Sequence, residues 1–97
     1  MPVDSLVSGC VAGDHRCQRE LFKRYRRKVL SLVSRSLGPG FDIDDVLQQV
    51  FIRVFKSLGS FQELSSLDTW VYRITVKVCT DQLRRKYRKR RLDIVSD

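Results

Sequence analysis

Residues 42–58, DIDDVLQQVFIRVFKSL, decide the fold class of this chain. Their apolar positions recur at i, i+3, i+4 and i+7, which is the spacing of one face of an α-helix. Aspartates stand in the first turn and a lysine in the last, as the helix dipole favours. The stretch therefore predicts an amphipathic helix, whose apolar face is Ile43, Val46, Leu47, Val50, Phe51, Val54, Phe55 and Leu58.

Two helices are expected before this segment. Residues 14–38 have helical periodicity, with Asp14 suited to cap the N-terminus and Gly38 suited to end the helix. Residues 4–11 predict a short leading helix. Three cysteines and the single histidine, Cys10, His15, Cys17 and Cys79, could in principle bind zinc. The alternative, which we prefer, is that the cysteines are reduced residues packed at helix contacts, with no metal bound.

The last helix is expected to begin near Ser66, where Ser65 and Asp68 have the spacing of a capping box. It should run through residues 69–85 into the basic stretch 84–91. Its expected buried face is Leu67, Trp70, Val71, Ile74 and Val78, widened by Val76 and Leu83. Because no segment has a convincing strand pattern, the sequence predicts an all-α, compact bundle of four helices, one short and three longer.

The charge of the chain is concentrated at one end. The 97 residues carry a net charge of +8, and residues 84–91, RRKYRKRR, hold seven of the cations. Such a patch is typical of nucleic-acid binders, although anionic membrane surfaces can select for it too. No apolar run approaches the ~20 residues of a spanning helix, and no signal peptide is evident. We therefore expect a cytoplasmic protein without stable membrane insertion.

Enzymatic chemistry has no candidate residues in this sequence. There is no Ser/His/Asp arrangement, no phosphate-binding glycine loop and no HExxH motif. Aspartates in the first turn of the 42–58 helix could hold a divalent ion, but such residues usually serve the helix dipole. The sequence therefore predicts a protein that is not an enzyme and needs no cofactor.

One residue of the 42–58 helix, Ile52, points away from its apolar face. A single exposed isoleucine is ordinary on a soluble protein. An apolar residue ringed by amides and a few charges also describes the centre of a protein–protein contact. The outward face consists of Asp45, Gln48, Gln49, Ile52, Arg53 and Lys56.

The last helix carries a mostly cationic row at i, i+4, i+7 and i+11. The row is Arg73, Lys77, Thr80 and Arg84, continued by Arg88. A solvated face is the ordinary explanation, but almost no acid is interleaved, and phosphates would relieve the repulsion between like charges.

The connection at residues 59–70, GSFQELSSLDTW, precedes this helix. Small hydroxyl residues beside aromatic ones suit a single unstacked base. The alternative is an ordinary capped turn, in which Phe61 and Trp70 pack into the core.

Together, these segments resemble region 2 of the extracytoplasmic-function (ECF) sigma factors of bacteria. The resemblance rests on D-x-x-D-V-L-Q-Q-V-F-I-R-V-F, S-S-L-D-T-W-V-Y-R-I and D-Q-L-R-R in order, preceded by AGDHRCQRELFKRY, and covers about residues 4–91. It implies a four-helix domain that binds core RNA polymerase and opens the promoter −10 element. An anti-sigma factor is a further expected partner.

The resemblance also implies roles for individual residues. The helix matching 42–58 would dock on the clamp helices of the β′ subunit, through Asp45, Gln48, Gln49, Ile52, Arg53 and Lys56. The loop would capture a base flipped out of the non-template −10 strand, and the last helix would hold the DNA. The residues implied in DNA binding are Ser60, Phe61, Gln62, Ser65, Ser66, Trp70, Arg73, Lys77, Arg84, Arg85 and Arg88.

The sequence departs from the family pattern at several positions. Gln49 replaces a usual acid, Val76 and Lys77 replace a common Arg and Asn, and the cysteines stand where alanine is common. We expect residues 1–91 to form the region 2 domain and residues 92–97 to begin a linker, without the family's second, −35-reading domain. The alternative function is a helical adaptor or anti-activator domain that binds DNA nonspecifically.

Overall fold

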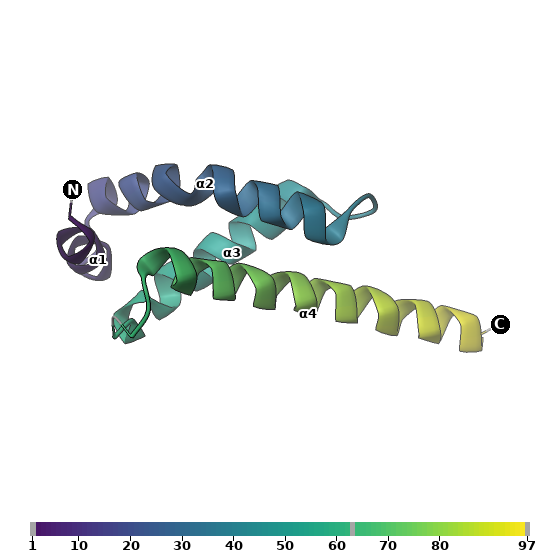
Figure 1. The fold of residues 1–97 in the computed structure, drawn as a ribbon. Coiled ribbons are helices and arrows are strands. Elements are labelled where there is room, and N and C mark those ends of the chain that lie inside the picture. The colour runs from purple at the N-terminus through teal and green to yellow at the C-terminus, as the bar shows by residue number, and fades with distance from the viewer. Residues whose placement is uncertain (1, 63, 97) are drawn as a thin grey trace.

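Four α-helices in series make up the structure, a computed structural model that describes residues 2–62 and 64–96 and side chains through residue 93 (Figure 1). They are α1 (Val3–Val11), α2 (His15–Leu37), α3 (Ile43–Ser57) and α4 (Leu67–Ser96), with a short 3-10 turn, η1 (Leu58–Ser60), after α3. The described residues contain no strand. The predicted all-α bundle, with one short and three longer helices, is confirmed.

Helices α2 and α4 run side by side in the same direction, and α3 runs in the opposite sense and packs across both (Figure 1). Helix α1 packs against the start of α2. The last turns of α4 extend beyond the α2–α3 connection, so the molecule is elongated, at 55 × 22 × 22 Å. Within the described part of the chain, no helix has both the length and the apolar character needed to span a membrane.

The ends of α2 and α3 follow local sequence signals. The Asp14 carboxylate accepts a hydrogen bond from the Arg16 backbone N–H at 2.9 Å. The Asp42 carboxylate likewise accepts from the Asp45 N–H at 3.1 Å. Gly38, at φ +66°, ends α2 in a conformation that side chains disfavour. The Asp14 cap, the acidic start of α3 and the glycine stop follow the sequence pattern.

The start of α4 differs from the predicted capping box. The Ser66 hydroxyl, rather than that of Ser65, accepts the N–H of Thr69 at 3.1 Å. The Asp68 carboxylate instead points toward α2 and accepts a hydrogen bond from the hydroxyl of Tyr25. The expected start near Ser66 is therefore right, but the pairing of Ser65 with Asp68 is wrong, because a tertiary partner holds the carboxylate.

The core is a single apolar cluster formed by all four helices. Val76 was expected to widen the buried face of α4, but it is 39% exposed, so that expectation is wrong. Thr75 is fully buried instead, and its hydroxyl donates a hydrogen bond to the Val71 carbonyl at 2.8 Å. Leu83 is half-buried against the cluster, as predicted. Truncating a buried leucine such as Leu21 to alanine should cost about 2–5 kcal/mol.

Candidate functional site

The outward face of α3 is centred on Ile52, whose side chain is 60% exposed. The prediction that this residue points away from the core is confirmed. Ile52 lines a groove of about 300 Å³ between α3 and α4. Residues from both helices line this α3–α4 groove, namely Gln49, Ile52, Arg53, Lys56, Val78, Asp81, Gln82 and Arg85.

Side chains of α4 hold the polar residues of α3 in place. The amide of Gln49 donates to Asp45 at 2.7 Å and accepts from Gln82 of α4 at 2.9 Å. The guanidinium of Arg53 lies 3.3 Å from the carboxylate of Asp81. These bonds orient the outward face before any partner arrives.

Sequence reasoning missed Asp81 and Gln82. The positions of Val78, Asp81, Gln82 and Arg85 share one side of α4 at i, i+3, i+4 and i+7, which was the available signal. Within the described residues, no carboxylate lies within ion-pair distance of Lys56 or Arg85. The groove therefore presents uncompensated positive charge beside an exposed apolar residue.

The cationic row of α4 faces solvent. Arg73, Lys77, Arg84 and Arg88 are all exposed. The two acids closest to the row in sequence do not neutralise it, because Asp68 contacts α2 and Asp81 contacts Arg53 of α3. The row therefore keeps its positive charge for an anionic ligand.

The basic stretch 84–91 divides among different surfaces. Arg84, Arg88 and Arg91 surround a shallow hollow that continues the cationic row. The ammonium of Lys86 lies 4.5 Å from the ring centre of Phe41 and so is occupied by a cation–π contact. Arg85, which the sequence grouped with the DNA contacts, lines the α3–α4 groove.

The connection between α3 and α4 combines exposed polar groups with a buried edge. The rings of Phe61 and Trp70 lie 5.4 Å apart, and both pack partly against the core. Gln62 and Ser66 are exposed, while the Ser60 hydroxyl donates to the Ser57 carbonyl at 2.6 Å. The aromatic pair thus forms a wall of the loop, beside exposed amide and hydroxyl groups.

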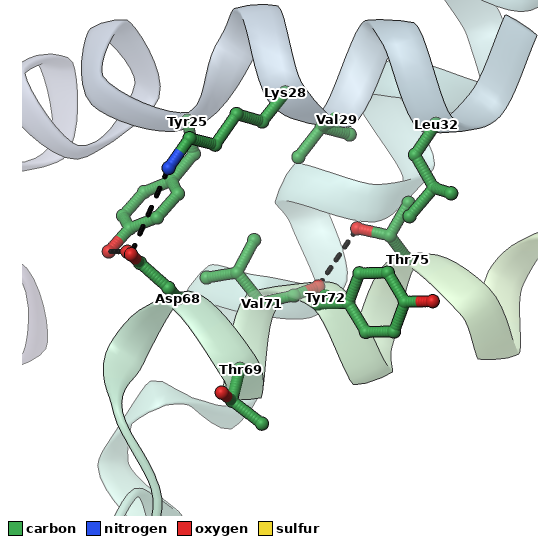
Figure 2. A pocket seen from close by; sticks show the side chains of 9 residues that line it. All are labelled: Tyr25, Lys28, Val29, Leu32, Asp68, Thr69, Val71, Tyr72 and Thr75. Atoms are coloured by element: carbon green, nitrogen blue, oxygen red, sulfur yellow. Dashed lines mark hydrogen bonds and ion pairs between the residues drawn. The ribbon is translucent and has the colours of Figure 1, made fainter.

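The loop is also fixed to α2 through Asp68. The Tyr25 hydroxyl donates to this carboxylate at 2.6 Å, and the Lys28 ammonium lies 3.8 Å from it (Figure 2). Burial raises the pKa of Tyr25 above its ordinary value, and the hydrogen bond to Asp68 raises it further. Tyr25 therefore stays a neutral donor at physiological pH.

All three cysteines are buried at helix contacts, as predicted. Burial, with smaller effects from the charges of Cys17 and Asp14, raises the pKa of the Cys10 thiol to about 11. Among the described residues, no group of three or more His, Cys, Asp or Glu side chains is arranged to hold a metal ion.

Comparison with known proteins gives concordant matches. The family model described as Sigma-70 region 2 matches residues 21–89. The ECF RNA polymerase sigma-E factor of Escherichia coli (strain K12) is 41% identical over 78 residues, which are 80% of this chain and 40% of that protein. The ECF RNA polymerase sigma factor SigM of Mycobacterium tuberculosis is 34% identical over 80 residues, 82% of this chain and 41% of that protein. The chain thus spans about 40% of the length of these relatives.

One similar solved structure is an NMR structure of an engineered region 2 of sigmaE in complex with GTAAAA. It matches with a TM-score of 0.80 and 36% sequence identity, covering 92% of this chain and 93% of that one. The two folds therefore agree along almost the whole of both chains.

Proposed function

We propose that this chain, which belongs to the sigma-70 region 2 family in its ECF branch, binds core RNA polymerase and recognises the promoter −10 element. Membership in the family rests on the match of residues 21–89 to the family model and on the ECF relatives. The role follows from the relatives and from the surfaces described above, and it is not enzymatic.

Core polymerase would dock in the α3–α4 groove. Ile52 provides an exposed apolar centre, and Gln49 and Arg53 are held in place by α4. The cations Lys56 and Arg85 favour an acidic partner surface. We assign this groove to the clamp helices of the β′ subunit, with Asp45, Gln48, Gln49, Ile52, Arg53 and Lys56 as contacts. Arg85 then acts with this surface rather than with the DNA.

The non-template −10 strand would lie on the loop and on the exposed side of α4. An unstacked base would meet the wall formed by Phe61 and Trp70, with Gln62, Ser65 and Ser66 supplying hydrogen bonds. Arg73, Lys77, Arg84 and Arg88 would hold phosphates. Similarity to the sigmaE domain bound to GTAAAA supports this assignment.

One observation carries the proposal most strongly. Among the described residues, the α3–α4 groove and the hollow lined by Arg84 and Arg88 share none, so that one domain could hold protein and DNA together. We further propose that residues 1–91 make up the region 2 domain and that α4 leads from residue 92 into a linker. An anti-sigma factor is a further proposed partner.

Selection from a randomised pool of single-stranded hexanucleotides tests the DNA half of this proposal. The domain should enrich strands that share a fixed base, because a base pocket distinguishes bases that phosphate contacts cannot. If the bound oligonucleotides had the same base composition as the starting pool, the domain would not recognise sequence in the strand. That result would favour an adaptor that binds DNA nonspecifically.

A further inference from the structure

Helix α2 carries a second cationic row with the same pattern as the row on α4. Its members, Arg24, Lys28, Ser31 and Arg35, recur at i, i+4, i+7 and i+11. The α4 row has the same order of residue types, arginine, lysine, hydroxyl and arginine, in Arg73, Lys77, Thr80 and Arg84. The proposed contacts with polymerase and the −10 strand make no use of the α2 row.

A groove separates α2 from α4 beside this row. It has a volume of about 300 Å³ and is mostly apolar, with Val29, Val71 and Thr75 among its lining residues (Figure 2). Tyr72 forms part of its wall and is 56% exposed. Tyr72 also lines a neighbouring hollow, together with Ser31 and Arg35. An exposed aromatic ring therefore stands between an apolar floor and a cationic edge.

Charge in this α2–α4 groove is strongly unbalanced. Helix α2 contains eight lysines and arginines and a single acid, Glu20. Among the described residues that line the groove, Asp68 is the one carboxylate. Its oxygens already accept the Tyr25 hydroxyl and face the Lys28 ammonium, so they do not neutralise Arg35. The guanidinium of Arg24 lies 6.0 Å from the ring centre of Tyr25.

We propose that the α2–α4 groove is a second site for single-stranded nucleic acid, with a base stacked on Tyr72 and the neighbouring phosphates on Lys28 and Arg35, which both line the hollow beside that ring. Aromatic rings beside a cationic track are the usual means by which proteins hold single strands. This inference rests on the proposed function, since the strand would reach the groove from the loop.

The groove begins next to the loop, so one bound strand could contact both. Asp68 and Thr69, at its near end, belong to the first turn of α4, immediately after the loop. A strand whose flipped base occupies the loop could therefore place a following nucleotide against Tyr72 without leaving the surface. The two cationic rows would then hold phosphates on either side of that ring.

Oligonucleotide length provides the test. Fluorescence anisotropy would compare the selected hexanucleotide with the same bases extended at both ends by thymidines. The wild-type domain should bind the extended strand more tightly. Tyr72→Ala should remove about five-fold or more of that gain, because stacking on an aromatic ring has this magnitude. Tyr72→Phe should retain it, which separates stacking from the hydroxyl group.

The cationic row has a matched control on the same helix. Lys28→Gln with Arg35→Gln should lower the salt dependence of extended-strand binding by about 0.7 for each phosphate that is no longer bound. Arg19→Gln with Arg26→Gln removes equal charge from outside the row and should have a smaller effect on the extended strand. Circular dichroism melting would verify that each variant folds, since all of these side chains are exposed.

Two results would overturn the inference while leaving the proposed function intact. In the first, the domain selects a hexanucleotide but binds the extended strand no more tightly than the hexanucleotide. The other is a gain that Tyr72→Ala and the Lys28/Arg35 variant leave unchanged, because the added nucleotides would then bind outside the groove. Failure to select any hexanucleotide would count against the proposed function itself.

Discussion

The hydroxyl of Tyr25 donates a 2.6 Å hydrogen bond to the carboxylate of Asp68 and so joins the middle of α2 to the first turn of α4. The two residues are separated by 43 positions in sequence. The loop that we assign to base capture ends just before Asp68, at the start of α4. The geometry of that loop therefore depends on α2 as well as on its own sequence.

Replacing Tyr25 with phenylalanine should destabilise the domain by about 1 kcal/mol, a typical value for one hydrogen bond. The cost stays modest because Asp68 is exposed and regains water. Urea unfolding of the variant would measure it, with Tyr72→Phe, an exposed hydroxyl, as the control. A Tyr25→Phe domain as stable as the wild type would contradict the role given to this bond.

Stability should fall in alkaline solution. Burial raises the pKa of Cys10 from 9.0 to about 11 and that of Tyr25 above 10.0, so both groups ionise more readily in the unfolded chain. Above pH 9 the unfolded chain therefore binds fewer protons, and the free energy of unfolding decreases as pH rises through 9 to 11. Denaturation curves at stepped pH would measure this decline, and Cys10→Ala should reduce it. An unchanged free energy of unfolding between pH 8 and 11 would contradict the burial of these groups.

Changing Ile52 to glutamate should abolish binding to core polymerase while leaving the melting temperature nearly unchanged. The side chain is 60% exposed, so the charge costs little in the free domain but would be buried at the contact. A pull-down with core polymerase measures binding. Val11→Glu, at an apolar position of α1 that is 56% exposed, is the matched control and should still bind. A large drop in melting temperature for Ile52→Glu would mean that this face is buried.

Neighbouring arginines of α4 should behave differently. Arg84→Ala with Arg88→Ala should weaken binding to every DNA strand alike and lower the salt slope by roughly 0.7–0.9 for each phosphate that is no longer bound. Arg85→Ala should leave the slope unchanged and weaken polymerase binding, because Arg85 lines the α3–α4 groove. Titrations at several salt concentrations compare the variants. Equal slopes for wild type and the Arg84/Arg88 variant would place the phosphate contacts elsewhere.

Loop substitutions should alter base preference rather than affinity for all strands. Gln62→Ala and Ser65→Ala should erode selection of one base with little change in salt slope, because edge hydrogen bonds release few counterions. Repeating the hexanucleotide selection with each variant tests this expectation. If both variants kept the wild-type base preference at every position, the loop would not be the part of the domain that reads the strand.

Local signals predicted the helices well. The periodicity of residues 42–58, the cap Asp14 and the stop at Gly38 each depend on nearby residues, so the sequence was sufficient to find them. The outward position of Ile52 followed from the same periodicity.

Features that depend on distant partners were missed. The sequence assigned Asp68 to a capping box, but Tyr25 of α2 holds it. It gave Val76 to the core in place of Thr75, whose hydroxyl is satisfied within its own helix. It did not anticipate that Arg85 lines the groove shared with α3, and the partner of this residue stays a prediction. Each of these features depends on how the helices pack against one another, and the spacing of residues along one helix does not predict that packing.

Gel filtration of a three-component mixture tests the central claim, that one domain carries separate polymerase and DNA surfaces. Core polymerase, the domain and a labelled selected hexanucleotide are run together, with a run lacking the domain as control. We predict that the domain carries the hexanucleotide into the polymerase peak, but not its complement. If polymerase instead displaced the strand from the domain, the two surfaces would overlap, and the claim would be wrong.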